Sequence, residues 1–178
     1  MIYREIIELN DRDDDDDEKQ NPRWIRLTPA ELVMEGVSAI ALIATFILMM
    51  YYWGKVDDEI PVYFIYGVAM AWLSKAYLLI IPFIALILGA VMSLYAYMAQ
   101  KSVAAKLKAQ KFARMQYLVD RFYLSLIKME VMIILFIMER RTILLALGQR
   151  LGSFEMIVFA VALVVTLVKY ISRRAKIT

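Results

Sequence analysis

Long apolar segments alternate with short polar ones over most of the chain, and their lengths predict membrane-spanning helices. An α-helix rises 1.5 Å per residue, so about 20 apolar residues cross a hydrocarbon core of about 30 Å. Four stretches have this character: residues 32–53, 76–98, 117–138 and 154–171. Because the links between them are short, they predict an all-α fold, an integral membrane four-helix bundle with antiparallel helices. The predicted four-span domain covers residues 31–174.

The first span has clear signals at both ends. Thr28 stands before Pro29, and Glu31 follows three residues after Thr28. This spacing predicts a capping box, with Pro at the first helical position. Residues 51–53 are Tyr-Tyr-Trp, and such aromatic residues are typical of a membrane interface.

The two ends of the chain are polar. Residues 1–30 contain the acidic run Asp13–Asp17, which repels itself and predicts a solvated, flexible cytoplasmic tail. An EF-hand alternates its ligands and places a Gly at the sharp turn, which five consecutive Asp do not. No metal site and no cofactor are therefore expected. Residues 175–178 form a short basic C-terminal end.

A fifth apolar segment, Pro61–Leu73, is too short to cross a bilayer. It contains several aromatic residues, which favour the membrane interface. We expect it to lie in that interface or to fold back against the bundle. The segment 139–149 is ambiguous, because apolar residues continue past Arg140 and Arg141.

Basic residues predict the orientation. Most Lys and Arg residues lie in the N-terminal segment, between residues 101 and 121, and at the C-terminal end. The positive-inside rule places these regions in the cytoplasm, so both termini of this multi-pass protein are predicted to be cytoplasmic. Five basic residues are candidates for contact with anionic lipid or a cytoplasmic partner: Lys101, Lys106, Lys108, Lys111 and Arg114. Nucleic acid is not expected as a partner, because the adjacent anionic lipid competes for the same charges.

The amino-acid composition excludes several kinds of catalytic chemistry. Hydrophobic residues make up 62% of the chain and charged residues 22%, and there is neither Cys nor His. This excludes disulfides, thiolate catalysis and the commonest general base. Ser125 and Lys128 are three residues apart, but nothing nearby suggests an oxyanion hole for a Ser–Lys nucleophile. A non-enzymatic protein is predicted.

Three charges fall inside the predicted spans and are candidate intramembrane charges: Glu35, Lys128 and Glu130. Lys128 and Glu130 are two residues apart, so they point about 200° from each other and cannot pair on one helix face. Lys128 is predicted to extend, or snorkel, toward the cytoplasmic interface. The alternative is an interior charge with a function.

Glu31 and Glu35 lie one helical turn apart near the start of the first span. We interpret Glu31 as a first-turn carboxylate that complements the helix dipole. Glu35 fits that role in part, and we expect it to meet Lys101 or Arg121. The alternative is a proton or cation relay through the two carboxylates.

A family resemblance rests on the stretch after the first span. Residues 58–64 read Asp-Glu-Ile-Pro-Val-Tyr-Phe, followed by Gly67, Trp72, Ser74-Lys75 and Pro82. This resembles the small bacterial membrane domain of unknown function found at the N-terminus of SdpI-type toxin-immunity proteins. The chain departs from the family pattern at four positions, where less polar residues replace the usual His, Asn, Asp and Gly: Tyr63, Ile65, Met70 and Leu73.

The resemblance implies a location in the bacterial inner (plasma) membrane. It also implies an immunity or envelope-signalling role, with a toxin peptide meeting the outer loop or a cytoplasmic repressor held at the membrane. The candidate loop residues are Pro61, Tyr63, Gly67, Trp72, Ser74 and Lys75. The alternative function is a small transporter or channel component that acts as an oligomer and uses the intramembrane charges.

Overall fold

The computed structural model describes residues 27–65, 68–106, 111–149 and 154–177. For residues 61–65, 68–70, 99–106, 111–116 and 176–177 it describes the backbone alone. The described elements are α2 (Pro29–Tyr52), β1 (Glu59–Ile65), β2 (Val68–Ser74), the 3-10 helix η2 (Lys75–Leu79), α3 (Ile80–Lys106), α4 (Lys111–Ala146) and α5 (Phe154–Ile177). The acidic segment before residue 27 lies outside the described residues.

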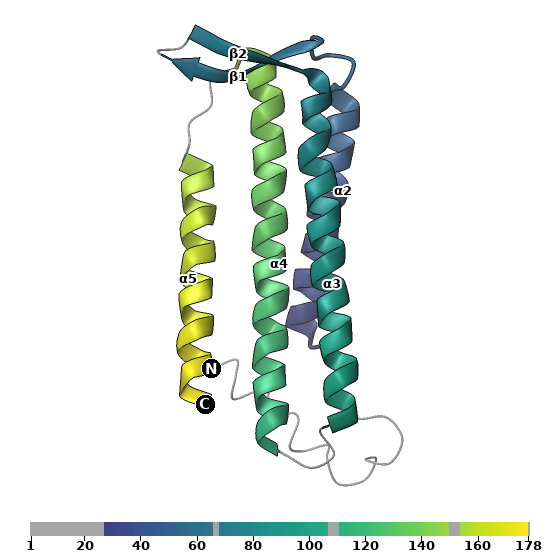
Figure 1. Ribbon diagram of the computed structural model, residues 1–178, viewed down its shortest axis with the longest axis vertical. Coiled ribbons are helices and arrows are strands. Elements are labelled where there is room, and N and C mark those ends of the chain that lie inside the picture. Colours follow the sequence, from purple (N-terminus) through teal and green to yellow (C-terminus); the bar gives the residue numbers. More distant parts are fainter. Residues whose placement is uncertain (1–26, 66–67, 107–110, 150–153, 178) are drawn as a thin grey trace.

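The four long helices lie side by side, and each runs opposite to the one before it in the chain (Figure 1). Helix α4 is the central element, because it packs against α2, α3 and α5. Its C-terminal end also contacts β1 and η2, which lie at the end of the helices opposite the start of α2. Side chains of α4 can therefore contact three other helices, and the candidate site forms where α4 meets two of them, α2 and α3.

Among the described residues, three helices are long and apolar enough to cross a membrane: Pro29–Tyr52, Lys75–Met98 and Phe154–Ala175. They correspond to the first, second and fourth predicted spans. The predicted third span lies in α4, which has 36 residues. Every stretch of 18 residues within α4 contains at least three Asp, Glu, Lys or Arg, so α4 is too polar to qualify by composition.

The predicted capping box is present at the start of α2. The Glu31 N–H donates to Thr28 Oγ1 at 3.3 Å, and the Thr28 N–H donates to Glu31 Oε2 at 2.7 Å. Two of the N–H groups that a helix start leaves without partners are thus satisfied. This cap also fixes the Glu31 carboxylate in place.

The segment that was predicted to lie in the interface or to fold back against the bundle forms a hairpin of two antiparallel strands. Strands β1 and β2 pair from Glu59 with Ser74 to Ile65 with Val68, with register shifts on either side of Tyr63. At the base of the hairpin, the Lys75 N–H donates to the Asp58 carbonyl at 2.9 Å. β-branched and aromatic residues favour strands, and residues 60–65 consist almost entirely of them.

A hydrophobic cluster joins the hairpin to the helices. Ile60, Leu78 and Ile143 are almost completely buried there, against Met49 and Val56. Helix α4 thus continues through the ambiguous segment as far as Ala146, because Ile143 has an apolar environment to fill. Two residues after the helix ends, Gly148 has a φ of 77°, a conformation that favours glycine.

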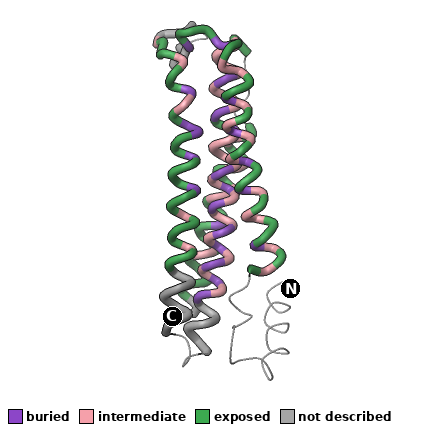
Figure 2. The backbone as a smooth tube through the Cα atoms, turned by 90° about the vertical axis from the view of Figure 1, so that its right-hand side faces the viewer, coloured by how far each residue is buried: buried purple, intermediate pink, exposed green. Residues whose placement is uncertain are grey.

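Many large apolar side chains lie on the outside of the helices, and several polar and charged side chains are buried between them. Large apolar side chains on α2, α3 and α5 are exposed, among them Ile40, Ile87 and Val161. Figure 2 shows exposed positions running along the helices. Where the structure describes side chains, the buried polar residues are Glu31, Ser38, Thr45, Arg121, Ser125, Lys128, Glu130, Glu139 and Thr166. An apolar exterior, with the buried polar and charged groups paired inside, is what a bilayer environment selects.

Candidate functional site

A groove lies between α2, α3 and α4 and is open on one side. Its volume is about 280 Å³. The lining residues are Glu35, Ser38, Ala39, Leu42, Leu86, Gly89, Ala90, Ser93, Lys128 and Met132. Because α2 and α3 run in opposite directions, Glu35 lies near Ser93 at one end and Leu42 near Leu86 at the other. We call this space the α2–α3 groove.

The polar end of the groove is a cluster of four side chains from three helices. The Lys128 ammonium donates to Glu35 Oε2 at 2.5 Å and to Ser93 Oγ at 2.7 Å. Ser125 Oγ donates to Glu35 Oε1 at 3.3 Å. The cluster holds one positive and one negative charge, so its formal net charge is zero.

The two charges of this cluster differ in exposure. The Lys128 side chain is 11% exposed, whereas the Glu35 side chain is 32% exposed. The Glu35 side chain is therefore partly open to its surroundings, while the Lys128 side chain is almost covered and its ammonium is held by two acceptors.

The prediction that Lys128 snorkels is wrong. Its ammonium turns inward to Glu35 and Ser93, because these two acceptors neutralise and solvate it within the helices. Glu35 pairs with Lys128, a partner that the sequence analysis did not name. The side chain of Lys101, one of its two expected partners, lies outside the described part of the chain.

Glycine 89 allows the close approach of helices that positions this cluster. A Cβ at Gly89 would lie 3.2 Å from Met132 Cε, so the end of the Met132 side chain would have to move by a few tenths of an ångström. Its carbonyl also accepts a hydrogen bond from Ser93 Oγ at 2.8 Å. With its proton directed there, the Ser93 oxygen is left to accept from Lys128.

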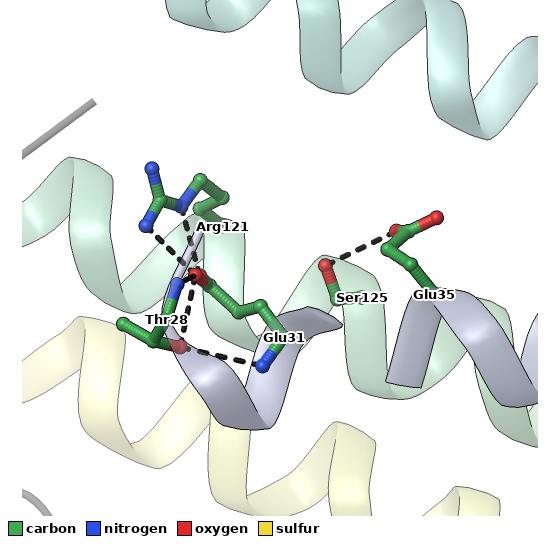
Figure 3. Close-up of polar contacts among 5 residues, drawn as sticks. All are labelled: Thr28, Glu31, Glu35, Arg121 and Ser125. Carbon is green, nitrogen blue, oxygen red and sulfur yellow. Dashed lines mark hydrogen bonds and ion pairs between the residues drawn. The ribbon is translucent and has the colours of Figure 1, made fainter. Parts of the chain in front are cut away.

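A second ion pair lies between the same two helices, α2 and α4. Arg121 Nε donates to Glu31 Oε1 at 2.8 Å, and Arg121 Nη2 donates to Glu31 Oε2 at 2.7 Å. The side chains are 7% and 2% exposed. Figure 3 shows the Arg121 side chain converging on Glu31, next to the cap made by Thr28. Glu31 therefore forms a buried ion pair with Arg121, in addition to the interaction with the helix dipole that its position predicts.

Glu130 faces a different neighbour. Thr166 Oγ1 on α5 donates to Glu130 Oε1 at 2.7 Å. Lys128 and Glu130 therefore point to different sides of α4, as their spacing predicted. Of the three candidate intramembrane charges, only Glu35 and Lys128 come together.

Glu139 is a buried carboxylate that the sequence did not single out. It is completely buried, and within the described part of the chain neither of its oxygens has a hydrogen-bond partner. Ser93 and Thr166 were also missed. Small hydroxyl residues inside apolar spans are the available signal, because such groups hydrogen-bond across helices.

The candidate loop residues lie in or beside the hairpin, away from the α2–α3 groove. Pro61 and Tyr63 belong to β1, Trp72 and Ser74 to β2, and Lys75 begins η2. Gly67 lies outside the described residues. The Lys75 ammonium pairs with Asp58 and thereby lowers the pKa of that carboxyl. It also lies 5.7 Å from the centre of the Trp53 ring.

The candidate basic residues lie at the opposite end of the helices. Lys101 and Lys106 belong to α3, and Lys111 and Arg114 to α4. Lys108 lies outside the described residues. These positions flank the connection between α3 and α4, so the backbone is consistent with one basic region at that end.

The chain was compared with known proteins. No family model matches it, and no curated protein or solved structure matches it significantly. The resemblance to the membrane domain of SdpI-type proteins therefore stays a prediction that rests on the residues between Asp58 and Pro82.

Proposed function

We propose that the protein is a non-enzymatic, four-span protein of the bacterial inner membrane that binds a membrane-borne ligand, in toxin immunity or envelope signalling. In this proposal α4 is the remaining span, both termini are cytoplasmic, and the hairpin of β1 and β2 lies at the outer surface. The α2–α3 groove is the ligand site.

One observation carries the proposal: a neutral pair of charges forms the end wall of a groove that opens sideways. Ionisable residues within a membrane are costly and usually functional. The Glu31–Arg121 pair already links α2 to α4 in a closed, fully paired arrangement. The Glu35–Lys128 pair is instead reached from the groove, as a ligand site requires.

Labelling of single cysteines tests the topology. The chain has no Cys, so introduced cysteines have no background. We expect Asp57→Cys to react with a membrane-impermeant maleimide added to intact cells, and Ser102→Cys to react only after the cells are opened. Labelling of Ser102→Cys from outside would contradict the proposed orientation.

Growth protection tests the function. Cells that express the protein are exposed to a panel of membrane-active peptide toxins, alongside cells that express Glu35→Gln at the same level. We expect protection against at least one toxin with the unaltered chain and its loss with Glu35→Gln. Equal protection by the two proteins would contradict a role for the groove.

A small transporter or channel component that acts as an oligomer is the second candidate. It is favoured by the buried carboxylates of Glu130 and Glu139 on α4, because proton pathways use such groups. Proteoliposomes with a trapped pH indicator separate the two candidates. If the protein only binds a ligand, we expect no proton flux under an imposed potential. If it transports protons, we expect a flux that the substitution Lys128→Met abolishes.

A further inference from the structure

We infer that the α2–α3 groove binds a long-chain lipid with an uncharged hydroxyl head group, taken from the leaflet next to the start of α2. This inference rests on the proposed function and names the ligand class for the same site. Its arguments are the charge of the polar end, the hydrogen-bonding capacity left there, and the direction in which the groove changes from polar to apolar.

The charge of the groove selects a neutral head group. Glu35 and Lys128 carry opposite charges and contact each other, so their sum is zero. An ionic head group would leave one uncompensated charge in an apolar setting, which is costly. A neutral head group leaves the pair intact.

The remaining hydrogen-bonding capacity fits a group that both donates and accepts. An ammonium has three N–H donors, and Lys128 uses two of them, to Glu35 and Ser93, within the part of the chain that the structure describes. Each Glu35 oxygen accepts one hydrogen bond and has room for another. A hydroxyl can accept from Lys128 and donate to Glu35.

The polarity gradient matches the way a lipid lies in one leaflet. Glu35 is six residues after Pro29, which places it about 9 Å along α2, and Leu42 about 20 Å along α2. The polar end therefore lies nearer the membrane surface, and the apolar end, with Leu42, Leu86 and Met132, lies nearer the midplane. The volume of about 280 Å³ accommodates roughly nine groups the size of water or methylene. That is a head group and the first part of one chain.

Photolabelling tests the inference. The full chain is reconstituted in phosphatidylcholine nanodiscs with an oleyl alcohol that carries a diazirine in its chain. Four unlabelled competitors share that chain length and differ in head group: oleyl alcohol, oleyl sulfate, oleylamine and octadecene. We expect labels on residues that line the groove, and oleyl alcohol to compete at about tenfold lower concentration than the others, because a hydrogen bond to a charged group gives about this factor.

Two variants should switch the head-group preference. Glu35→Gln leaves the Lys128 charge unbalanced, so oleyl sulfate should become the best competitor. Lys128→Met leaves the Glu35 charge unbalanced, so oleylamine should become the best. The double variant restores zero charge and keeps a donor and an acceptor in Gln, so oleyl alcohol should again compete best. An unchanged preference in the folded variants would overturn the inference.

Two alanine-to-phenylalanine substitutions, one inside the groove and one outside it, test where the lipid binds. Ala90→Phe fills the groove from an exposed position and should lower labelling at least about tenfold. Ala160→Phe makes the same change at an exposed position of α5, outside the groove, and should leave labelling unchanged. Equal labelling of both variants would overturn the inference. So would a disulfide between two chains that carry Ala90→Cys, because a second copy would then occupy the groove.

The two proposals fail separately. If no lipid labels the groove while Glu35→Gln still abolishes growth protection, the ligand class is wrong and the proposed function stands. If the lipid binds as expected and no toxin is resisted, the inference stands and the immunity role is contradicted.

Discussion

The two ion pairs between α2 and α4 use the same kinds of residue in different ways. Glu31 and Arg121 form two hydrogen bonds that occupy both carboxylate oxygens, and both side chains are almost fully buried. Glu35 and Lys128 share one contact, and Glu35 remains about one-third exposed. The first pair is closed, while the second borders a groove. An arginine fork suits permanent pairing, whereas a lysine keeps a donor for another partner.

The largest effect is expected from breaking the closed pair. Arg121→Met leaves the Glu31 carboxylate buried without its partner, which costs about 3–5 kcal/mol of unfolding free energy. Unfolding in mixed micelles, followed by circular dichroism during titration with sodium dodecyl sulfate, measures this loss. A loss below about 1 kcal/mol would show that Glu31 has another source of stabilisation.

Breaking the open pair should cost less. Lys128→Met removes two hydrogen bonds, but Glu35 can be solvated through the groove, so we expect a loss of about 1–3 kcal/mol. The same titration measures it, with Ser93→Ala as a control that removes only one acceptor. A loss as large as that of Arg121→Met would mean that the two pairs do not differ in the way described.

A still smaller effect is expected at the contact between α4 and α5. Thr166→Val keeps the shape of the side chain but removes the hydroxyl that donates to Glu130. Hydrogen bonds between membrane helices contribute about 0.6–1.7 kcal/mol, and the loss should fall in that range. A larger loss would show that α5 depends on this one bond for its position.

The smallest effect is expected at an exposed pair. Arg140 Nη1 contacts Glu155 Oε2 at 3.2 Å, and both side chains are about half exposed. Glu155→Gln should therefore change the unfolding free energy by about 0–1 kcal/mol, and less at high salt. A salt-independent loss would contradict its assignment as a solvated pair.

The sequence predicted the parts of the fold that depend on local pattern. Three of the four spans and the capping box at Thr28 follow from the length of apolar runs and from residue spacing. The opposite directions of Lys128 and Glu130 follow from helical geometry alone. Each of these requires knowledge of one helix only.

The hairpin and the ion pairs were not predicted, for physical reasons. Residues 60–65 are apolar on both sides of the strand, so they lack the alternation that marks a half-buried strand. The partner of Lys128 depends on which helix packs opposite it, and a position on one helix does not contain that information. Glu35 and Lys128 are 93 residues apart in the chain.

In the proposed four-span arrangement, the charges of α4 have a consequence for how the chain enters the membrane during synthesis. On the biological insertion scale, Lys or an acidic residue at the centre of a helix adds about 2.5–3.5 kcal/mol to the cost of insertion. α4 carries Lys128 and Glu130 in its middle. The partners of Lys128 lie on α2 and α3, which are made before α4, whereas the partner of Glu130 lies on α5, which is made after it. The translocon should therefore retain α4 beside α2 until α5 emerges, and a chain truncated before α5 should leave α4 poorly inserted.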